Sequence, residues 1–180
     1  RKFACPAKNL RTGTRPIRPE VFVRFLWITG VALILDQFTK WWVLKTMVLG
    51  ESIPVLGSFF RLTYIHNPGA VFGLKLGNPY VHLALACVAL VVVCYLLWRL
   101  PAEDRATAIG LALVLGGAIG NIIDRVRFGV VIDFLDFGFE SVRWWVFNLA
   151  DTWVSVGTGL LILSFAFTKK ERVSENSTRT

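Results

Sequence analysis

Apolar residues are gathered into four long runs, and this clustering is the strongest pattern in the chain. The runs cover about residues 21–43, 80–98, 106–123 and 145–167. A helix needs about 20 apolar residues to cross the hydrocarbon core of a bilayer, and each run is close to that length. No repeat or low-complexity tract interrupts the series. The pattern therefore predicts a single bundle of four transmembrane helices.

Basic residues mark the ends of these runs. Of the 180 residues, 54% are hydrophobic and 18% are charged, whereas about a quarter of the residues in a soluble domain are charged. The net charge of +8 is concentrated in residues 1–24 and 169–180, and two further arginines lie in the link at 99–105. Such segments face the cytoplasm and contact phospholipid headgroups. We exclude nucleic-acid binding, because no aromatic or helical reading surface accompanies the basic tails.

The chain is expected to have one folded domain between two tails. Residues 1–20 contain three prolines and many charges, which predicts a disordered cytoplasmic tail. Residues 21–168 form the four-helix membrane domain, and residues 169–180 form a basic cytoplasmic tail. The first run has no small-residue cleavage site and three more runs follow it, so we interpret it as a retained helix.

This topology leaves two outer loops, at about 49–79 and 124–144. The first loop contains FFRLTYIHN between the turn signals LGS and NPG, which predicts a β-strand lying on the outer surface.

Ionisable side chains inside an apolar run must find a partner or a watery cavity, so they mark candidate functional positions. In the fourth run, Asn148, Asp151, Ser155 and Thr158 recur on one face of a helix, with Trp153 on the opposite side. We expect Asp151 to face the interior of the bundle, near its outer end.

The third run carries a second polar face. Gly116 and Gly120 have the G-x-x-x-G spacing that allows helices to approach closely. Gly117, Asn121 and Asp124 share a face, and we expect Asn121 and Asp124 to hydrogen-bond across to the fourth helix. Two roles remain open for the polar residues of this face: they fix the packing of the helices, or they take part directly in catalysis.

Two further polar stretches stand out. Asp36 and Lys40 lie four positions apart in the favourable acid-to-base order, which predicts either a structural ion pair or a lysine that reaches lipid phosphates. Asn67 lies in the turn-rich stretch HNPGAVFG, where Gly69 and Gly73 permit close backbone approach to a ligand.

The stretch VVIDFLDF adds Asp133 and Asp136 in apolar surroundings. A helical turn would bring the two together, while an extended chain would separate them. Spacing alone leaves Asp124, Asp133 and Asp136 open as partners of Asp151. Two adjacent carboxylates share one proton, so one can take a proton from water while the other polarises a carbonyl group.

The chain has two histidines, His66 and His82, and we interpret His82 as a packing or interfacial residue. No Ser-His or Cys-His arrangement competes with the aspartates. No cluster has metal-ligand spacing, so we expect no metal or other cofactor.

Five stretches together resemble one family, the lipoprotein signal peptidases (signal peptidase II). They are DQFTK (36–40), NPGAVFG (67–73), GGAIGNIIDR (116–125), VVIDF (130–134) and FNLAD (147–151). Their order and spacing also match, and the resemblance covers residues 22–167. It implies an all-α membrane protein, a bundle of four transmembrane helices with a small β-cradle in the first extracytoplasmic loop. Such a protein would lie in the bacterial cytoplasmic (inner) membrane, with both termini cytoplasmic and the active site near the outer leaflet.

The resemblance further implies an aspartic endopeptidase. Its partners would be diacylglyceryl-modified prolipoproteins, cleaved before the lipidated cysteine, and the inhibitor globomycin. By the matching motifs, Asp133 and Asp151 would be the catalytic pair. Other matched positions would bind substrate or brace the site: Asn67, Gly69, Asn121, Asp124, Arg125, Asn148, Ala150, Asp36 and Lys40. The long basic N-terminal tail and Val71, where many relatives have alanine, depart from the usual pattern.

Two other classes of function remain to be weighed. A proton or cation translocator would also place Asp36, Asp124 and Asp151 in membrane spans, but the inner half of the spans is nearly all apolar. A non-enzymatic scaffold would explain the glycine-rich face and leave the outer aspartates without a role.

Overall fold

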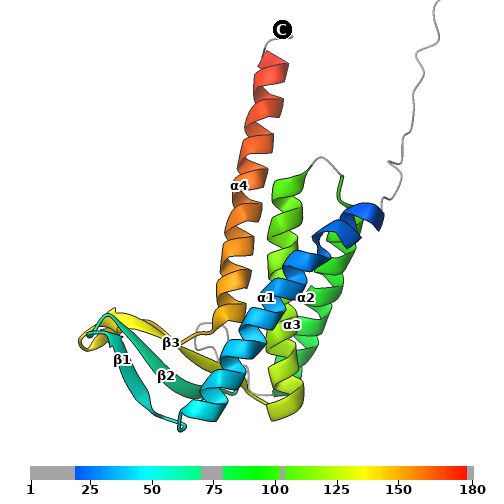
Figure 1. Cartoon of the computed structure of the whole chain (residues 1–180). Helices are drawn as coiled ribbons and strands as arrows, with labels where there is room; N and C mark the ends of the chain where they lie inside the picture. The colour runs from blue at the N-terminus through cyan, green and yellow to red at the C-terminus, as the bar shows by residue number, and fades with distance from the viewer. Residues whose placement is uncertain (1–18, 70–78, 102–103, 178–180) are drawn as a thin grey trace, which may run out of the picture.

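The computed structural model describes residues 19–69, 79–101 and 104–177. Its helices are α1 (Pro19–Thr46), α2 (Pro79–Arg99), α3 (Arg105–Phe128) and α4 (Leu149–Ser177). Its strands are β1 (Ser52–Leu56), β2 (Phe60–Asn67), β3 (Val131–Phe139) and β4 (Val142–Arg143). Each of the four helices contains a stretch long and apolar enough to cross a membrane. The helices form a bundle with the sheet at one end, which confirms the predicted fold class (Figure 1). Gly73 and Val71 lie outside the described residues.

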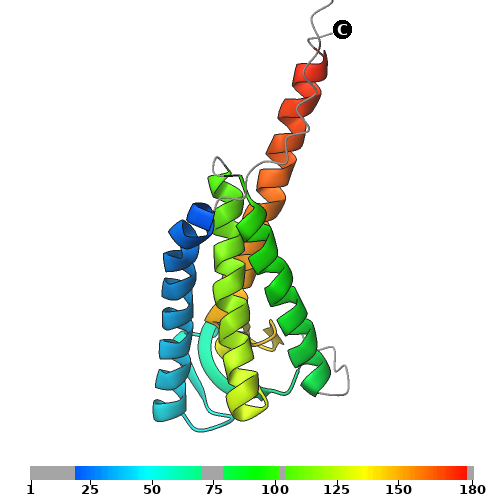
Figure 2. The same cartoon turned by 90° about the vertical axis from the view of Figure 1, so that its right-hand side faces the viewer.

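Helix α3 is the centre of the bundle and packs against α1, α2 and α4 (Figure 2). Glycines allow this close packing. A Cβ atom added to Gly110 would lie 2.9 Å from the backbone oxygen of Gly157 on α4. A Cβ atom added to Gly116 would lie 2.8 Å from the side chain of Ala32 on α1. The two faces of α3 therefore hold different helices at short range.

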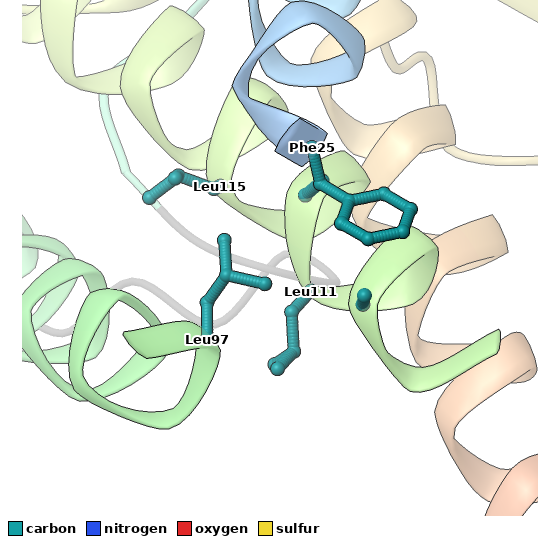
Figure 3. Close-up of a cluster of buried hydrophobic side chains, with 6 residues drawn as sticks. Phe25, Leu97, Leu111 and Leu115 are labelled. Carbon is teal, nitrogen blue, oxygen red and sulfur yellow. The ribbon is translucent and has the colours of Figure 1, made fainter. Parts of the chain in front are cut away.

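One face of α1 is buried from Phe25 onward. The buried residues recur every three or four positions: Phe25, Thr29, Ala32, Asp36, Lys40 and Val43, with Met47 following just after the helix. At the beginning of α1 this face is apolar, and Phe25 packs into a cluster with Leu97, Leu111 and Leu115 (Figure 3). Nearer the sheet the same face carries Asp36 and Lys40. The buried face of the helix thus carries its charges between the apolar cluster around Phe25 and a second one that contains Val43.

The sheet is antiparallel, with the strand order β1-β2-β3-β4. Strand β2 confirms the strand predicted in the first outer loop. The second outer loop also contributes, since β3 and β4 come from it. Asp133 pairs with Ile65, and Asp136 pairs with Arg61. Because side chains alternate along a strand, Asp133 and Asp136 point to opposite faces; the alternative of a helical turn is wrong.

Strand β3 is tied to both helices that flank it. Gly129 ends α3 with a φ of 71°, a left-handed conformation that favours glycine and turns the chain into β3. The backbone N–H of Leu135 donates to the oxygen of Phe147 at 2.7 Å, and the Phe147 N–H donates back at 3.0 Å. The end of α3, the middle of β3 and the start of α4 are therefore held together.

Helix α4 differs from the prediction at several points. It begins at Leu149, later than the apolar run at 145, because the preceding chain pairs with β3, and it continues to Ser177, beyond the end of that run at 167. Ser155 and Thr158 are exposed, so the predicted polar stripe is wrong beyond the first turn. Trp153, expected on the opposite side, donates from its indole nitrogen to the Ala32 oxygen of α1 at 3.1 Å. Small residues decide which face of α4 packs, because they let its backbone approach α3.

Candidate active site

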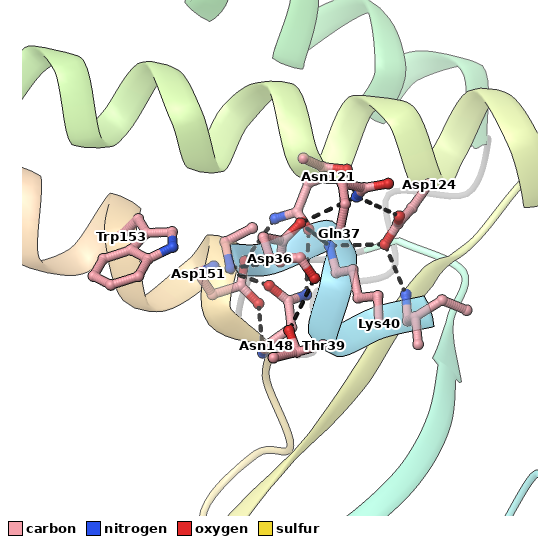
Figure 4. Close-up of polar contacts among 12 residues, drawn as sticks. Asp36, Gln37, Thr39, Lys40, Asn121, Asp124, Asn148, Asp151 and Trp153 are labelled. Carbon is pink, nitrogen blue, oxygen red and sulfur yellow. Dashed lines mark hydrogen bonds and ion pairs between the residues drawn. The ribbon is translucent and has the colours of Figure 1, made fainter. Parts of the chain in front are cut away.

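Polar side chains of α1, α3 and α4 converge at the end of the bundle that meets the sheet (Figure 4). They form two connected groups. The acid pair is Asp133 and Asp151, and the lysine cluster is Lys40, Asp36 and Asp124. The two groups differ in the donors that bind their carboxylates.

Asn148 holds the acid pair together. It immediately precedes α4, and its side-chain oxygen accepts the backbone N–H of Asp151 at 3.0 Å. The Asp151 carboxylate accepts the backbone N–H of Asn148 at 3.4 Å, which completes a reciprocal capping arrangement at the start of the helix. The side-chain nitrogen of Asn148 then donates to Asp133 at 2.6 Å. One asparagine therefore binds both acids.

Asp133 is almost fully buried, with 1% of its surface exposed. Its two oxygens accept from amide groups, Oδ1 from Asn148 at 2.6 Å and Oδ2 from Asn67 at 2.9 Å. Burial, and then the nearby Asp151 carboxylate, raise the pKa of Asp133 to about 7, while the two amides act in the opposite direction. This carboxyl group therefore titrates near neutral pH.

Asn121 connects the acid pair to the lysine cluster. Its side-chain nitrogen donates to Asp151 Oδ1 at 2.8 Å, as expected for a bond from the third helix to the fourth. Its side-chain oxygen accepts from Lys40 Nζ at 3.1 Å and from Asn148 at 3.2 Å. The Arg125 guanidinium donates to the Asn121 backbone oxygen at 3.2 Å and interacts electrostatically with the acid pair.

The lysine cluster is a buried ion pair network between α1 and α3. Lys40 Nζ lies 3.0 Å from Asp36 Oδ2 and 2.8 Å from Asp124 Oδ2. The predicted ion pair of Asp36 and Lys40 is confirmed. Lys40 does not reach lipid phosphates, because only 2% of it is exposed. The expectation that Asp124 bonds to the fourth helix is wrong, since it turns to Lys40 and accepts the Ile132 N–H at 3.2 Å.

Asp36 also fixes the start of α4. Its Oδ1 accepts the backbone N–H of Ala150 at 2.9 Å, one of the N–H groups that a helix start leaves without an internal partner. Ala150 is fully buried, and its backbone oxygen is where a Cβ atom on Gly117 would collide. The small residues at these positions let α1, α3 and α4 meet.

Gln37 belongs to the site and was missed from the sequence. Its side-chain nitrogen lies 3.1 Å from Asp36 Oδ2, 3.2 Å from Asp124 Oδ1 and 3.3 Å from the Gly120 oxygen. Its position beside Asp36 in an apolar run was the available signal. It adds a neutral donor to two carboxylates that share one lysine.

Asp136 lies outside this network. Arg143 Nε donates to its Oδ1 at 2.7 Å, and the Thr63 hydroxyl donates to its Oδ2 at 2.6 Å. The three partners that spacing left open for Asp151 are thus distinguished by their contacts. Asp124 binds Lys40, Asp136 binds Arg143, and Asp133 shares Asn148 with Asp151.

Gly69 lies in the turn after β2, where its N–H donates to the Asn67 side-chain oxygen at 3.1 Å. Its φ of 139° is a conformation that favours glycine. Every predicted site residue thus lies in or beside the network, on β2, β3, α1, α3, the start of α4 or the adjoining turns.

Comparisons with known proteins agree with one another. The sequence pattern of the family described as Signal peptidase (SPase) II matches residues 28–167. The lipoprotein signal peptidase of Syntrophus aciditrophicus is 42% identical over 155 residues, which cover 83% of this chain and 96% of that protein. The lipoprotein signal peptidase of Alteromonas mediterranea is 40% identical over 161 residues, covering 87% and 88%.

Two solved structures, each of a bacterial membrane enzyme, have a similar fold. The first has a TM-score of 0.73 and 27% identity, and covers 83% of this chain and 91% of that one. The second has a TM-score of 0.68 and 29% identity, with coverage of 79% and 92%.

Proposed function

Because the chain belongs to the signal peptidase II family, we propose that it is an aspartic endopeptidase whose catalytic residues are Asp133 and Asp151. The hydrogen bonds of Asn148 are the observation that carries this proposal. Asn148 donates to Asp133 at 2.6 Å and accepts from the Asp151 backbone at 3.0 Å, so it holds two carboxyl groups beside one another. Carboxyl groups arranged in this way share a proton.

The reaction follows from that shared proton. Near neutral pH the pair holds one proton, because ionising both neighbouring acids is unfavourable. The ionised carboxylate takes a proton from a water molecule, whose oxygen attacks the scissile carbonyl carbon. The protonated carboxyl donates a hydrogen bond to the carbonyl oxygen as negative charge develops there. Collapse of the tetrahedral species breaks the C–N bond, and the leaving amine receives the proton that the base took from water.

The surrounding residues keep the pair in place. Asn67, Asn121 and Asn148 donate neutral hydrogen bonds to the two acids. Asp36, Lys40, Asp124 and Ala150 fix α3 and the start of α4, which position Asn121 and Asn148. Gly69 shapes the turn of Asn67, and Arg125 adds positive charge near the pair. No cofactor enters this mechanism.

The substrates are prolipoproteins that carry diacylglycerol on the cysteine following the scissile bond. The curated relatives are lipoprotein signal peptidases, and four apolar helices allow lipid chains to lie against the bundle. The basic tails favour a cytoplasmic location for both termini in the bacterial inner membrane. The acid pair lies at the opposite end of α1 from its N-terminus, so it faces the outer leaflet in that topology.

A cleavage assay tests the proposal. The full chain, purified in detergent, is incubated with a diacylglyceryl-modified prolipoprotein peptide, with and without globomycin. We expect globomycin-sensitive cleavage before the lipidated cysteine. Asp133→Asn and Asp151→Asn should each lower the rate by at least about 100-fold, because general acid–base catalysis contributes that much or more.

Asp136→Asn is the matched control, since Asp136 lies on the same strand and binds Arg143. It should leave substantial turnover, and thermal unfolding should show that all three variants remain folded. Full activity in the Asp133 or Asp151 variant would contradict the proposed catalytic pair.

Proton or cation translocation gains no support from the structure. A translocator needs polar groups along the whole membrane span. Within the described residues, the end of the bundle away from the sheet is filled by the apolar cluster around Phe25 and Leu97. Endopeptidase activity therefore remains the better explanation for the buried aspartates.

A further inference from the structure

Asn67 is held at both ends of its side-chain amide. Its nitrogen donates to Asp133 Oδ2 at 2.9 Å. Its oxygen accepts the Gly69 backbone N–H at 3.1 Å, which closes a turn after β2. The turn therefore fixes which side of the amide faces Asp133. Any contact that holds Gly69 in place also holds the donor on the carboxyl group.

His82 makes such a contact. Gly69 is buried, and a Cβ atom added to it would lie 2.7 Å from Nδ1 and 2.8 Å from Cε1 of the His82 ring. The imidazole thus occupies the space that a side chain at position 69 would fill. His82 comes from the first turn of α2, a helix that contributes none of the site residues predicted from the sequence.

We propose that His82 is a positioning residue for the acid pair, and that its ring presses on Gly69 and thereby keeps Asn67 on Asp133. This inference rests on the proposed function. It assigns a role to a residue outside the five family motifs. The ring acts by filling space, so its removal lets the turn at positions 67–69 relax and moves the Asn67 amide away from the carboxyl group.

Relaxation of the turn should change the pH dependence of cleavage, which a variant that is only less stable would not do. The Asn67 amide lowers the pKa of Asp133, so losing it should raise that pKa and move the acid limb of the pH profile upward. Asp151 of α4, Lys40 of α1 and Arg125 of α3 also act on Asp133. These three residues are held through Asn121 and Asn148, so their effects on Asp133 should be unchanged.

The first experiment compares three variants of the full chain in the prolipoprotein cleavage assay. His82→Ala should lower kcat between about 10-fold and 100-fold, as small displacements of catalytic groups do, with little change in KM. His82→Phe keeps a ring against Gly69 and should retain most of the turnover. His66→Ala is the histidine control, because His66 is exposed and its ring bonds to the Tyr64 hydroxyl at 2.8 Å; it should behave like wild type.

A double-mutant cycle tests whether His82 acts through Asn67. In an Asn67→Ala background, His82→Ala should cause no further loss of kcat, because the bond that it protects is already absent. If the losses of kcat in the two single variants multiply in the double variant, the inference is overturned. A His82→Ala variant with wild-type kcat and an unchanged acid limb of the pH profile would also overturn it. An equal loss in His82→Phe would overturn packing on Gly69 as the cause. If the wild-type chain itself fails to cleave, the proposed function fails; wild-type cleavage with an unaffected His82→Ala variant contradicts this inference alone.

Discussion

The acid pair and the lysine cluster lie side by side, contain two aspartates each, and treat those aspartates differently. Asp36 and Asp124 share the Lys40 ammonium group, which lies 3.0 and 2.8 Å from their oxygens. Asp133 and Asp151 accept from the neutral amides of Asn67, Asn121 and Asn148. A buried cation attracts a carboxylate through its full charge, whereas a neutral amide offers a hydrogen bond without a counter-charge.

The difference separates the acids of the ion pair network from the two acids proposed to be catalytic. Burial alone does not separate the groups, since Asp133 is as buried as Asp36 and Asp124, each of them at most 1% exposed. The donors differ instead, since Lys40 brings a positive charge to Asp36 and Asp124, whereas Asp133 accepts from neutral amides. Burial, and then the nearby Asp151 carboxylate, raise the pKa of Asp133 to about 7, while the amides act in the opposite direction; such a pKa suits the proton exchange proposed for this group. A buried aspartate in a membrane protein is therefore best interpreted from its donors.

The largest expected effect comes from removing the cation. Lys40→Met leaves Asp36 and Asp124 buried without their counter-charge, and losing one partner of a buried ion pair costs about 3–5 kcal/mol. The free energy of unfolding in detergent, measured by chemical denaturation, should fall by that amount. Lys45→Met on the exposed part of the same helix is the control and should change it little. Equal stability in both variants would contradict a structural role for the lysine cluster.

A smaller effect is expected from a substitution that disturbs the acid pair and leaves the lysine cluster intact. Gly117→Ala places a Cβ atom against the Ala150 backbone oxygen, and overpacking of this kind costs about 1–3 kcal/mol. Because it pushes α4 from α3, it should weaken the bond from Asn121 to Asp151 and lower cleavage, while the ion pairs between α1 and α3 persist. Gly159→Ala on α4 meets open space and should leave cleavage and thermal stability unchanged.

The third expected effect concerns the dependence of stability on pH. The pKa of Asp133 lies near 7 in the folded protein, against an ordinary value of 3.8. Between these values the folded state holds a proton that the unfolded state has lost, so this group stabilises the fold at low pH and loses that contribution as pH rises through 7. The Asp133→Asn side chain cannot ionise, so the variant does not lose this stability as the pH rises.

The stability of the Asp133→Asn variant relative to wild type should therefore increase between pH 5 and pH 8, by about 2–3 kcal/mol. Thermal unfolding at the two pH values checks this, whatever constant offset the substitution adds. A relative stability that does not change with pH would mean that Asp133 is ionised throughout this range.

Much of the fold could be predicted because it depends on local patterns. Four apolar runs predicted four spans, and the stretch FFRLTYIHN predicted β2. The ion pair of Asp36 and Lys40 followed from their spacing on one helix. The motif resemblance selected Asp133, which the structure places with Asn148 and away from Asp136. These predictions needed only residues that are neighbours along the chain or motifs read in order.

The remaining features depend on contacts between distant segments. Periodicity placed Ser155 and Thr158 on the inner face of α4, but Gly157 sets the packed face by letting the backbone approach Gly110. The second outer loop joins the sheet because β3 pairs with β2, and no local pattern predicts that pairing. Asp124 bonds to α1 instead of α4 because Lys40 supplies a stronger partner there.

The sequence by itself determined the membrane-spanning architecture, the motifs and the identities of the buried polar residues, because apolar length and residue spacing are properties of a linear chain. The tertiary structure decided which acid meets which donor. Asp133, Asp124 and Asp136 are the same residue type, and each would bind any donor within reach. Their different environments come from the geometry that brings a lysine, an arginine or an asparagine to each carboxyl group.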